Sequence, residues 1–140
     1  MSADCSYLFV YGTLRQASQA PMSQVLASHS EYLDEGIING KLFDVGDYPA
    51  VTVSGTRNDR VLGEVFKINN PSLLKELDKY EGCSENCTKP HQYKRIKSAV
   101  KLRDGKEIQA WIYVWNLSVD SLHLIESGDY MSYLGITEPA

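Results

Sequence analysis

The sequence predicts one α+β domain built on a small curled or closed β-sheet. Most apolar segments are short and either continuous or alternating, as β-strands require. One segment has the apolar stripe of an amphipathic helix, and an Asp104-Gly105 pair between two strand-like runs is typical of a tight hairpin. The chain has 140 residues with no internal repeat or linker, which is the length of a single domain.

The first half of the chain predicts a buried strand, a short helix and further strands. Residues 7–11 are continuously apolar and stop at Gly12, as in a central strand buried on both faces. Pro21 opens a modest helical segment that continues to about His29. Strand-like segments punctuated by glycine follow at residues 37–45, 48–53 and 60–68.

The clearest helix is predicted to begin at Asn70 and to stop at Gly82. Asn is a favoured N-cap, and Pro71 in the first helical position has a preset φ and lacks a donor that would need a partner. Glycine is a natural C-terminal stop. The apolar stripe of this helix consists of Leu73, Leu74, Leu77 and Tyr80.

The second half predicts a two-stranded hairpin followed by a turn. Residues 93–103 and 107–115 are strand-like and meet at Asp104-Gly105. Apolar and basic residues alternate in the first strand, so one of its faces is predicted to be solvated. The alternating residues are Ile96, Val100 and Leu102 against Arg95, Lys97, Lys101 and Arg103. A turn at residues 126–130 precedes a short final segment.

Composition excludes several classes of partner. The net charge of −4 argues against nonspecific binding to nucleic acid or to anionic membranes. The N-terminus lacks the basic start and long apolar core of a signal peptide, and no apolar run reaches the length of a membrane span. We therefore expect a cytoplasmic protein with reduced thiols, and the oligomeric state stays open.

Glu81 is the first candidate for chemistry. At about 100° per residue, Leu74, Leu77 and Glu81 fall on one face of the predicted helix, so this carboxylate interrupts the apolar stripe. Burial and the negative end of the helix dipole would both raise its pKa, which suits a group that accepts and returns a proton. Alternatively, the helix frays at Gly82 and Glu81 points into water.

The end of the first strand is the second candidate. An apolar strand that stops at Gly12-Thr13 can present consecutive backbone N–H groups to an anion, because glycine allows a close approach. An ordinary turn is the alternative explanation.

A metal site is a weaker hypothesis. Cys83, Cys87 and His91 are spaced four residues apart, and Cys5 could add a fourth ligand. This spacing is unlike that of common zinc fingers or ribbons, and Pro90 restricts the loop. We therefore predict free thiols and no bound metal.

Five short motifs then occur in order along nearly the whole chain, from about residue 7 to residue 133. They are Phe9-Val10-Tyr11-Gly12-Thr13-Leu14-Arg15, Tyr48-Pro49-Ala50, Leu77-Asp78-Lys79-Tyr80-Glu81-Gly82, Tyr93-Lys94-Arg95 and Ser127-Gly128-Asp129-Tyr130. In this combination the sequence resembles the γ-glutamylcyclotransferase-like family, and among its members the small γ-glutamylamine cyclotransferase type.

The resemblance implies a compact mixed β-barrel with flanking helices and an enzyme of the transferase or lyase type. Such an enzyme would convert a γ-glutamyl amine or amino acid to 5-oxoproline and a free amine. The substrate's own α-amine attacks its δ-carbonyl, so neither an enzymic nucleophile nor a cofactor is required. The resemblance also implies a substrate-binding loop of Tyr11, Gly12, Thr13 and Leu14, with Glu81 as general acid/base.

Two aromatic residues are further candidates for the substrate cavity. Tyr93 and Tyr113 could line the cavity or orient the substrate, although a core or half-buried strand position explains each of them as well. Arg95 could pair with a carboxylate, and a solvated strand face is the alternative.

Some features stay open at this stage. The segment from Cys83 to Gln92 is longer than in the shortest family versions, and Tyr130 stands where the family often has Trp. Either difference could change the leaving group that is accepted, and glutathione is the less expected substrate. The competing hypothesis is a non-catalytic member of the same fold that binds a small ligand or a protein.

Overall fold

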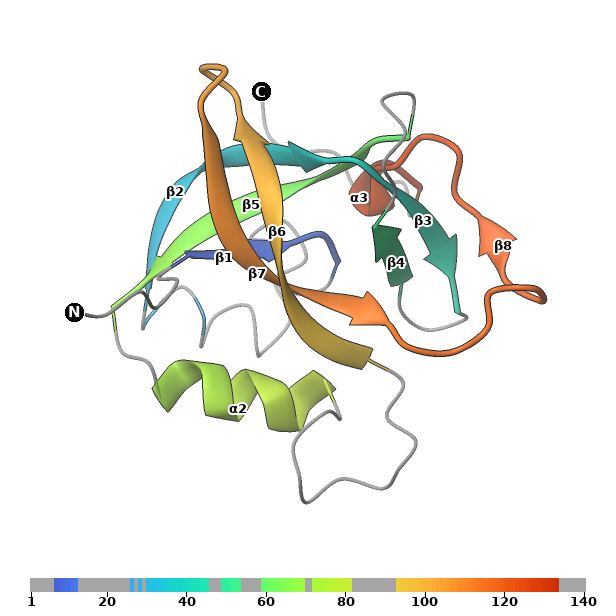
Figure 1. Ribbon diagram of the computed structural model, residues 1–140, viewed down its shortest axis with the longest axis horizontal. Helices are drawn as coiled ribbons and strands as arrows, with labels where there is room; N and C mark the ends of the chain where they lie inside the picture. Colours follow the sequence, from blue (N-terminus) through green and yellow to red (C-terminus); the bar gives the residue numbers. More distant parts are fainter. Residues whose placement is uncertain are drawn as a thin grey trace.

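The chain folds into a closed β-barrel with a second small sheet and helices beside it (Figure 1). The computed structural model describes residues 7–12, 26, 28, 30–45, 49–53, 59–69, 72–81 and 93–133, without the side chains of Tyr80, Glu81, Met131 and Ser132. Within these ranges the elements, in order, are β1 (Tyr7–Val10), β2 (Ser30–Ile38), β3 (Gly40–Asp44), β4 (Pro49–Val53), β5 (Val61–Ile68), α2 (Ser72–Glu81), β6 (Tyr93–Leu102), β7 (Glu107–Trp115), β8 (His123–Leu124) and α3 (Tyr130–Tyr133).

The barrel has the strand order β1-β5-β2-β6-β7. Its strands pair antiparallel except at the closure, where β1 and β7 run parallel with Leu8 opposite Trp111. The register between β2 and β5 shifts between Tyr32 and Asp34. Closure pairs every strand of the barrel on both sides, so none of the five has an open edge.

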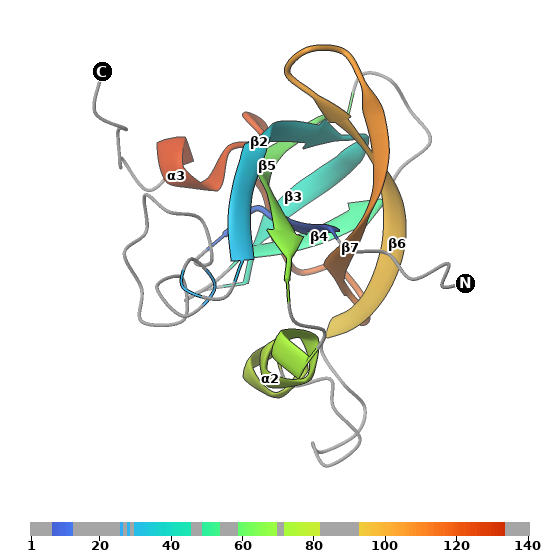
Figure 2. The ribbon, with the colours of Figure 1, turned by 90° about the vertical axis from the view of Figure 1, so that its left-hand side faces the viewer.

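The second sheet, of order β4-β3-β8 in the described part of the chain, lies to one side of the barrel in Figure 1. Helix α2 runs across the lower end of the barrel in that view, and the turned view of Figure 2 shows it nearly end-on in the same place. None of the helices in the described ranges has the length and apolar character that a membrane crossing requires.

Alternating residues of β1 belong to two different apolar clusters. Phe9 lies in a cluster with residues from all five barrel strands, whereas Leu8 and Val10 lie in a second cluster that includes Leu77 of α2. All of these side chains are at most 3% exposed. The continuous apolar run of β1 is therefore explained by burial on both faces, as predicted.

Several sequence predictions are confirmed and one is wrong. The strands predicted at residues 7–11, 48–53 and 60–68 and the hairpin joined at Asp104-Gly105 are all present. The segment 37–45, predicted as one strand, instead contains the end of β2, a bend at Asn39 and the start of β3.

The preceding part of β2 was missed altogether. Glu31, Tyr32 and Leu33 are exposed, and the register shift after Tyr32 breaks the alternation that marks a half-buried strand. The pattern therefore concealed a strand whose pairing with β5 and β6 is nonlocal.

Two predicted turns depend on glycine. Gly105 and Gly128 have φ values of 93° and 70°, a region that side chains disfavour. A Cβ on Gly128 would lie 1.9 Å from the Arg60 carbonyl oxygen. The carbonyl oxygen of Gly128 accepts a hydrogen bond from Leu62 N–H at 2.8 Å. The turn before α3 therefore packs against the start of β5 at Gly128, where a side chain would not fit.

The predicted helix at residues 21–29 and the helix start at Asn70-Pro71 fall mainly outside the described residues. Leu26 and Ser28 are described and are helical. Helix α2 is described from Ser72 and ends at Glu81, in agreement with the predicted stop before Gly82.

Candidate active site

Two residues that follow β1 hold its end in place: Tyr11 through a side-chain hydrogen bond and Gly12 through close packing of its backbone against Pro49. Tyr11 is 6% exposed, and its hydroxyl donates to the backbone carbonyl of Tyr113 at 2.5 Å. Gly12 is buried, and a Cβ at this position would lie 2.6 Å from Cγ of Pro49. Only glycine permits this packing without displacing the proline ring.

Tyr93 is fixed against the same proline. Its hydroxyl donates to the carbonyl of Pro49 at 2.5 Å, and its ring packs edge-on against Trp115, its register partner on β7, with centroids 5.4 Å apart. The end of β1, the start of β4 and the start of β6 therefore meet around Pro49.

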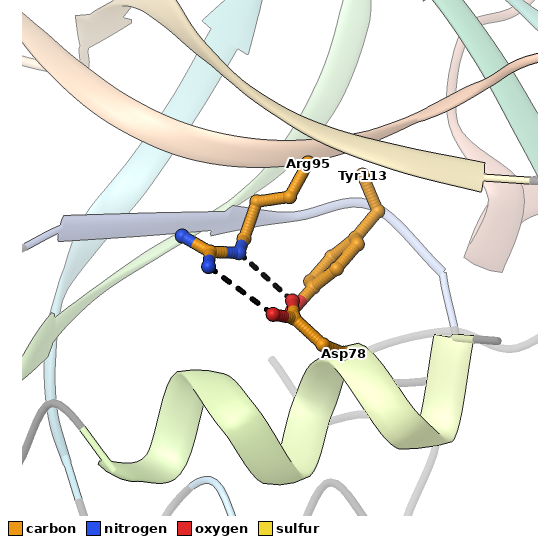
Figure 3. Close-up of polar contacts among 3 residues, drawn as sticks. All are labelled: Asp78, Arg95 and Tyr113. Atoms are coloured by element: carbon orange, nitrogen blue, oxygen red, sulfur yellow. Dashed lines mark hydrogen bonds and ion pairs between the residues drawn. The ribbon is translucent and has the colours of Figure 1, made fainter. Parts of the chain in front are cut away.

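A second cluster joins α2 to the β6–β7 hairpin (Figure 3). Asp78 accepts two hydrogen bonds from Arg95, at 2.8 Å from Nε and 3.1 Å from Nη2, and a third from the Tyr113 hydroxyl at 2.7 Å. Arg95 and Tyr113 are register partners, so both side chains project from the same face of the hairpin. The guanidinium also lies 4.4 Å from the ring centroid of Trp111. A bidentate ion pair with a stacked guanidinium is a directional contact.

Glu81, the predicted acid/base, is the last residue of α2. It lies three residues after Asp78, and its side chain is outside the described residues. The apolar side of the helix is as predicted at Leu73 and Leu77, which are 5% and 0% exposed.

The other predicted site residues fall into two groups. Tyr11, Gly12, Tyr93 and Tyr113 are brought together, because Tyr11 contacts Tyr113 while Gly12 and Tyr93 contact Pro49. Thr13 and Leu14 lie outside the described residues, as do the cysteines and His91 of the metal hypothesis, namely Cys5, Cys83 and Cys87.

Asp78 and Glu64 are two carboxylates that sequence reasoning left without a role. Asp78 stands within one of the quoted motifs and flanks the apolar stripe, which was the available signal. Glu64 lies in the largely apolar strand β5, is 3% exposed, and is opposite Val10 on one side and Glu35 on the other. A buried carboxyl group beside the end of β1 is unusual for a barrel interior and marks this part of the barrel as a candidate for function.

Comparison with known proteins identifies the family. Residues 8–132 match the family model described as gamma-glutamyl cyclotransferase, AIG2-like. The chain belongs to this family. The match spans Tyr11, Asp78, Arg95 and Tyr113, so all of the contacts described above lie within the family domain.

Relatives within the gamma-glutamyl cyclotransferase family agree in length and fold. The gamma-glutamylcyclotransferase family protein YtfP of Escherichia coli K12 is 36% identical over 125 residues, covering 89% of this chain and 95% of the relative. The solution structure of E. coli YtfP covers 91% of this chain and 97% of its own, with 30% identity and a TM-score of 0.59. A crystal structure of an AIG2-like protein from Mus musculus has a TM-score of 0.72 at 22% identity and covers 96% and 95% of the two chains. These likenesses confirm the predicted fold class, a mixed α+β barrel.

Proposed function

We propose that this chain cyclises a γ-glutamyl amine or γ-glutamyl amino acid, giving 5-oxoproline and the free amine or amino acid. One observation carries the proposal: the γ-glutamyl cyclotransferase family match includes both the Tyr11–Gly12 strand end and α2, and Tyr113 is hydrogen-bonded to each. The two segments to which the sequence assigns substrate binding and proton transfer are thus parts of one connected structure.

The chemistry needs only a positioned substrate and a proton carrier. The α-nitrogen attacks the δ-carbonyl carbon, a new C–N bond closes the five-membered ring, and the bond to the departing nitrogen breaks. The α-ammonium loses two protons in the process, and the departing nitrogen gains two and leaves as an ammonium ion. The proton balance is therefore zero, and the reaction consumes no cofactor.

Glu81 is the proposed proton carrier. A carboxylate can take the first proton from the α-ammonium and, as a carboxylic acid, deliver it to the departing nitrogen. Because the nucleophile belongs to the substrate, most of the entropic cost of attack is already met before binding.

The proposed substrate loop begins at Tyr11 and Gly12 and continues through Thr13 and Leu14. Backbone N–H groups in such a loop would stabilise the oxyanion that forms on the δ-carbonyl. The contact of Gly12 with Pro49 and the hydrogen bond of Tyr11 support this proposal, because they fix the position from which the loop departs.

Tyr93 and Tyr113 are proposed to contribute ring surface to the cavity. Their hydroxyl protons are already donated to the Pro49 carbonyl and to Asp78. Any substrate contact would therefore use their ring faces or their hydroxyl lone pairs. We also propose a cytoplasmic enzyme that acts on a small γ-glutamyl molecule, with no nucleic acid or membrane partner.

The test is turnover of a panel of γ-glutamyl amino acids and γ-glutamyl amines, with 5-oxoproline followed by mass spectrometry. We expect the wild type to form product and Glu81→Gln to lose at least about 100-fold in kcat, the scale of general acid/base catalysis. Glu76→Gln is the matched control, because it removes another carboxylate of α2, one that forms an exposed ion pair with Lys79 at 3.9 Å.

Each outcome has a defined meaning. A folded Glu81→Gln variant with wild-type turnover would remove Glu81 from the mechanism. If the folded wild type forms no product but a γ-glutamyl ligand stabilises it against heat, the protein is a non-catalytic binding protein and the proposed enzyme activity is wrong. The ranking of substrates identifies the leaving amine.

A further inference from the structure

Tyr113 connects the two halves of the proposed site. It is 3% exposed, its backbone carbonyl accepts the Tyr11 hydroxyl, and its own hydroxyl donates to Asp78 of α2. One residue of β7 is thus hydrogen-bonded both to the strand end that begins the proposed substrate loop and to the helix that ends at Glu81.

Arg95 completes the attachment of α2. Its guanidinium forms a bidentate pair with the Asp78 carboxylate and lies over the Trp111 ring, so its plane is held by contacts of two kinds. The Arg95 and Asp78 side chains are 23% and 18% exposed, which limits screening by solvent and salt.

Apolar packing alone would not fix the helix so closely. Leu73 and Leu77 attach α2 to the barrel, but apolar contacts are non-directional and tolerate small rotations and slides of a helix. Three hydrogen bonds to one carboxylate specify both the rotation of α2 and its position along its axis.

Asp78 lies close enough to Glu81 for this constraint to matter. Three residues of α-helix advance about 4.5 Å along the axis, so both residues belong to the last turn of α2. A displacement of about 1 Å in a catalytic group can cost about 100-fold in rate. The position of this turn relative to Tyr11 and Gly12 is therefore expected to control proton transfer.

We propose that Asp78, Arg95 and Tyr113 are positioning residues. They hold the last turn of α2, and with it the backbone of Glu81, at a fixed position relative to the strand end at Tyr11–Gly12. The part of this inference that concerns proton transfer rests on the proposed function. The mechanical part, that the three contacts restrain the end of α2, is independent of any reaction.

The decisive variant is Tyr113→Phe, paired with Tyr133→Phe as its control. Each substitution removes one tyrosine hydroxyl that donates to an aspartate at 2.7 Å, from Tyr113 to Asp78 or from Tyr133 to Asp44. Tyr133 lies on α3 and is 41% exposed, away from the α2 contact. Both variants keep the ring, so both are expected to fold, which circular dichroism checks.

Two readouts separate the parts of the proposal. We expect Tyr113→Phe to lower kcat between about 10-fold and 100-fold, with KM changed less than about twofold, and to leave the shape of the pH profile intact. We also expect faster hydrogen exchange in the peptide that contains the last turn of α2, since an amide that opens locally exchanges sooner. Tyr133→Phe should change neither readout.

A second pair of variants tests the carboxylate. Asp78→Asn should slow turnover at every pH and accelerate exchange at the end of α2, whereas Glu76→Gln on the exposed side of the same helix should do neither. If Asp78→Asn instead removes one limb of the pH profile, Asp78 transfers the proton itself and is not a positioning residue.

The outcomes distinguish this inference from the proposed function. Unchanged exchange in both Tyr113→Phe and Asp78→Asn would overturn the inference whatever the wild type catalyses. Faster exchange with normal kcat would overturn the link to catalysis. Faster exchange in a protein whose wild type forms no 5-oxoproline would support the restraint on α2 and overturn the proposed function.

Discussion

The two ends of strand β6 place arginines in contrasting surroundings. Arg95, near the start of the strand, forms a bidentate pair with Asp78 in which the two side chains are 23% and 18% exposed. Arg103, just beyond its end, is 65% exposed and divides its contacts between Glu35, at hydrogen-bonding distance, and Asp34, at 3.8 Å. The same residue type on the same hairpin therefore makes two different kinds of ion pair.

The difference shows that burial and geometry decide how much an ion pair contributes to stability and whether it fixes the position of an element. An exposed pair gains little, because water and salt screen it and because two long side chains lose conformational freedom. A half-buried pair with two parallel hydrogen bonds is directional, and leaving one partner alone is costly. We expect Arg95 to determine where α2 lies, and Arg103 to leave the position of β2 unchanged, since β2 is already paired with β5 and β6.

The largest expected effect comes from removing each arginine in turn. Arg95→Met keeps most of the aliphatic volume but leaves the Asp78 carboxylate half-buried without its cation. We expect a loss of about 2 kcal/mol in the free energy of unfolding, between the values typical of exposed and buried pairs. Arg103→Met should be indistinguishable from the wild type. Urea denaturation followed by tryptophan fluorescence measures both, and equal losses would contradict the comparison.

A smaller effect is expected from keeping the charge and changing its shape. Arg95→Lys retains the cation but loses the planar fork that matches the Asp78 carboxylate and stacks on Trp111. We expect about half the loss of Arg95→Met, on the order of 1 kcal/mol. Arg103→Lys is the control. If Arg95→Lys proves as stable as the wild type, charge alone explains the contact and its geometry does not matter.

Part of the fold could be predicted from local patterns, and part could not. Strand β1 and the β6–β7 hairpin were predicted because their signals are local: a continuous apolar run, an alternation and an Asp-Gly turn. Most of β2 was missed because its outer residues are exposed and its alternation is broken by the shift after Tyr32. The stability of β2 comes from partners about 30 and 65 residues later in the chain, which no local pattern reveals.

The candidate site likewise contains residues that local sequence patterns could identify and contacts that they could not. Glu81 could be singled out because it interrupts a helical stripe, and the resemblance independently gives it a role. The contact of Asp78 with Arg95 could not be predicted from alternation, which gives Arg95 a solvated position equal to that of Arg103. What separates the two arginines is the placement of α2 under one end of the hairpin, and that placement is a property of the tertiary structure.

The smallest expected effect concerns the exposed end, where Arg103 acts on Tyr32 through charge. The pKa of Tyr32 is raised by burial first and then by the carboxylates of Glu64, Glu35 and Asp34, whereas the positive charge of Arg103 lowers it. Arg103→Met should therefore raise the pKa of Tyr32 further above 10. The direction of this shift also determines how stability depends on pH. A tyrosine whose pKa is raised by folding favours the folded state below the unfolded pKa of about 10 and loses this contribution as pH rises through the folded pKa.

Titration of the Tyr32 ring by NMR, assigned with Tyr32→Phe, measures the shift in the pKa. A constant pKa would mean that the exposed guanidinium is fully screened from Tyr32, and the contrast between the two ends of β6 would then be greater. A fall in the pKa would contradict the prediction.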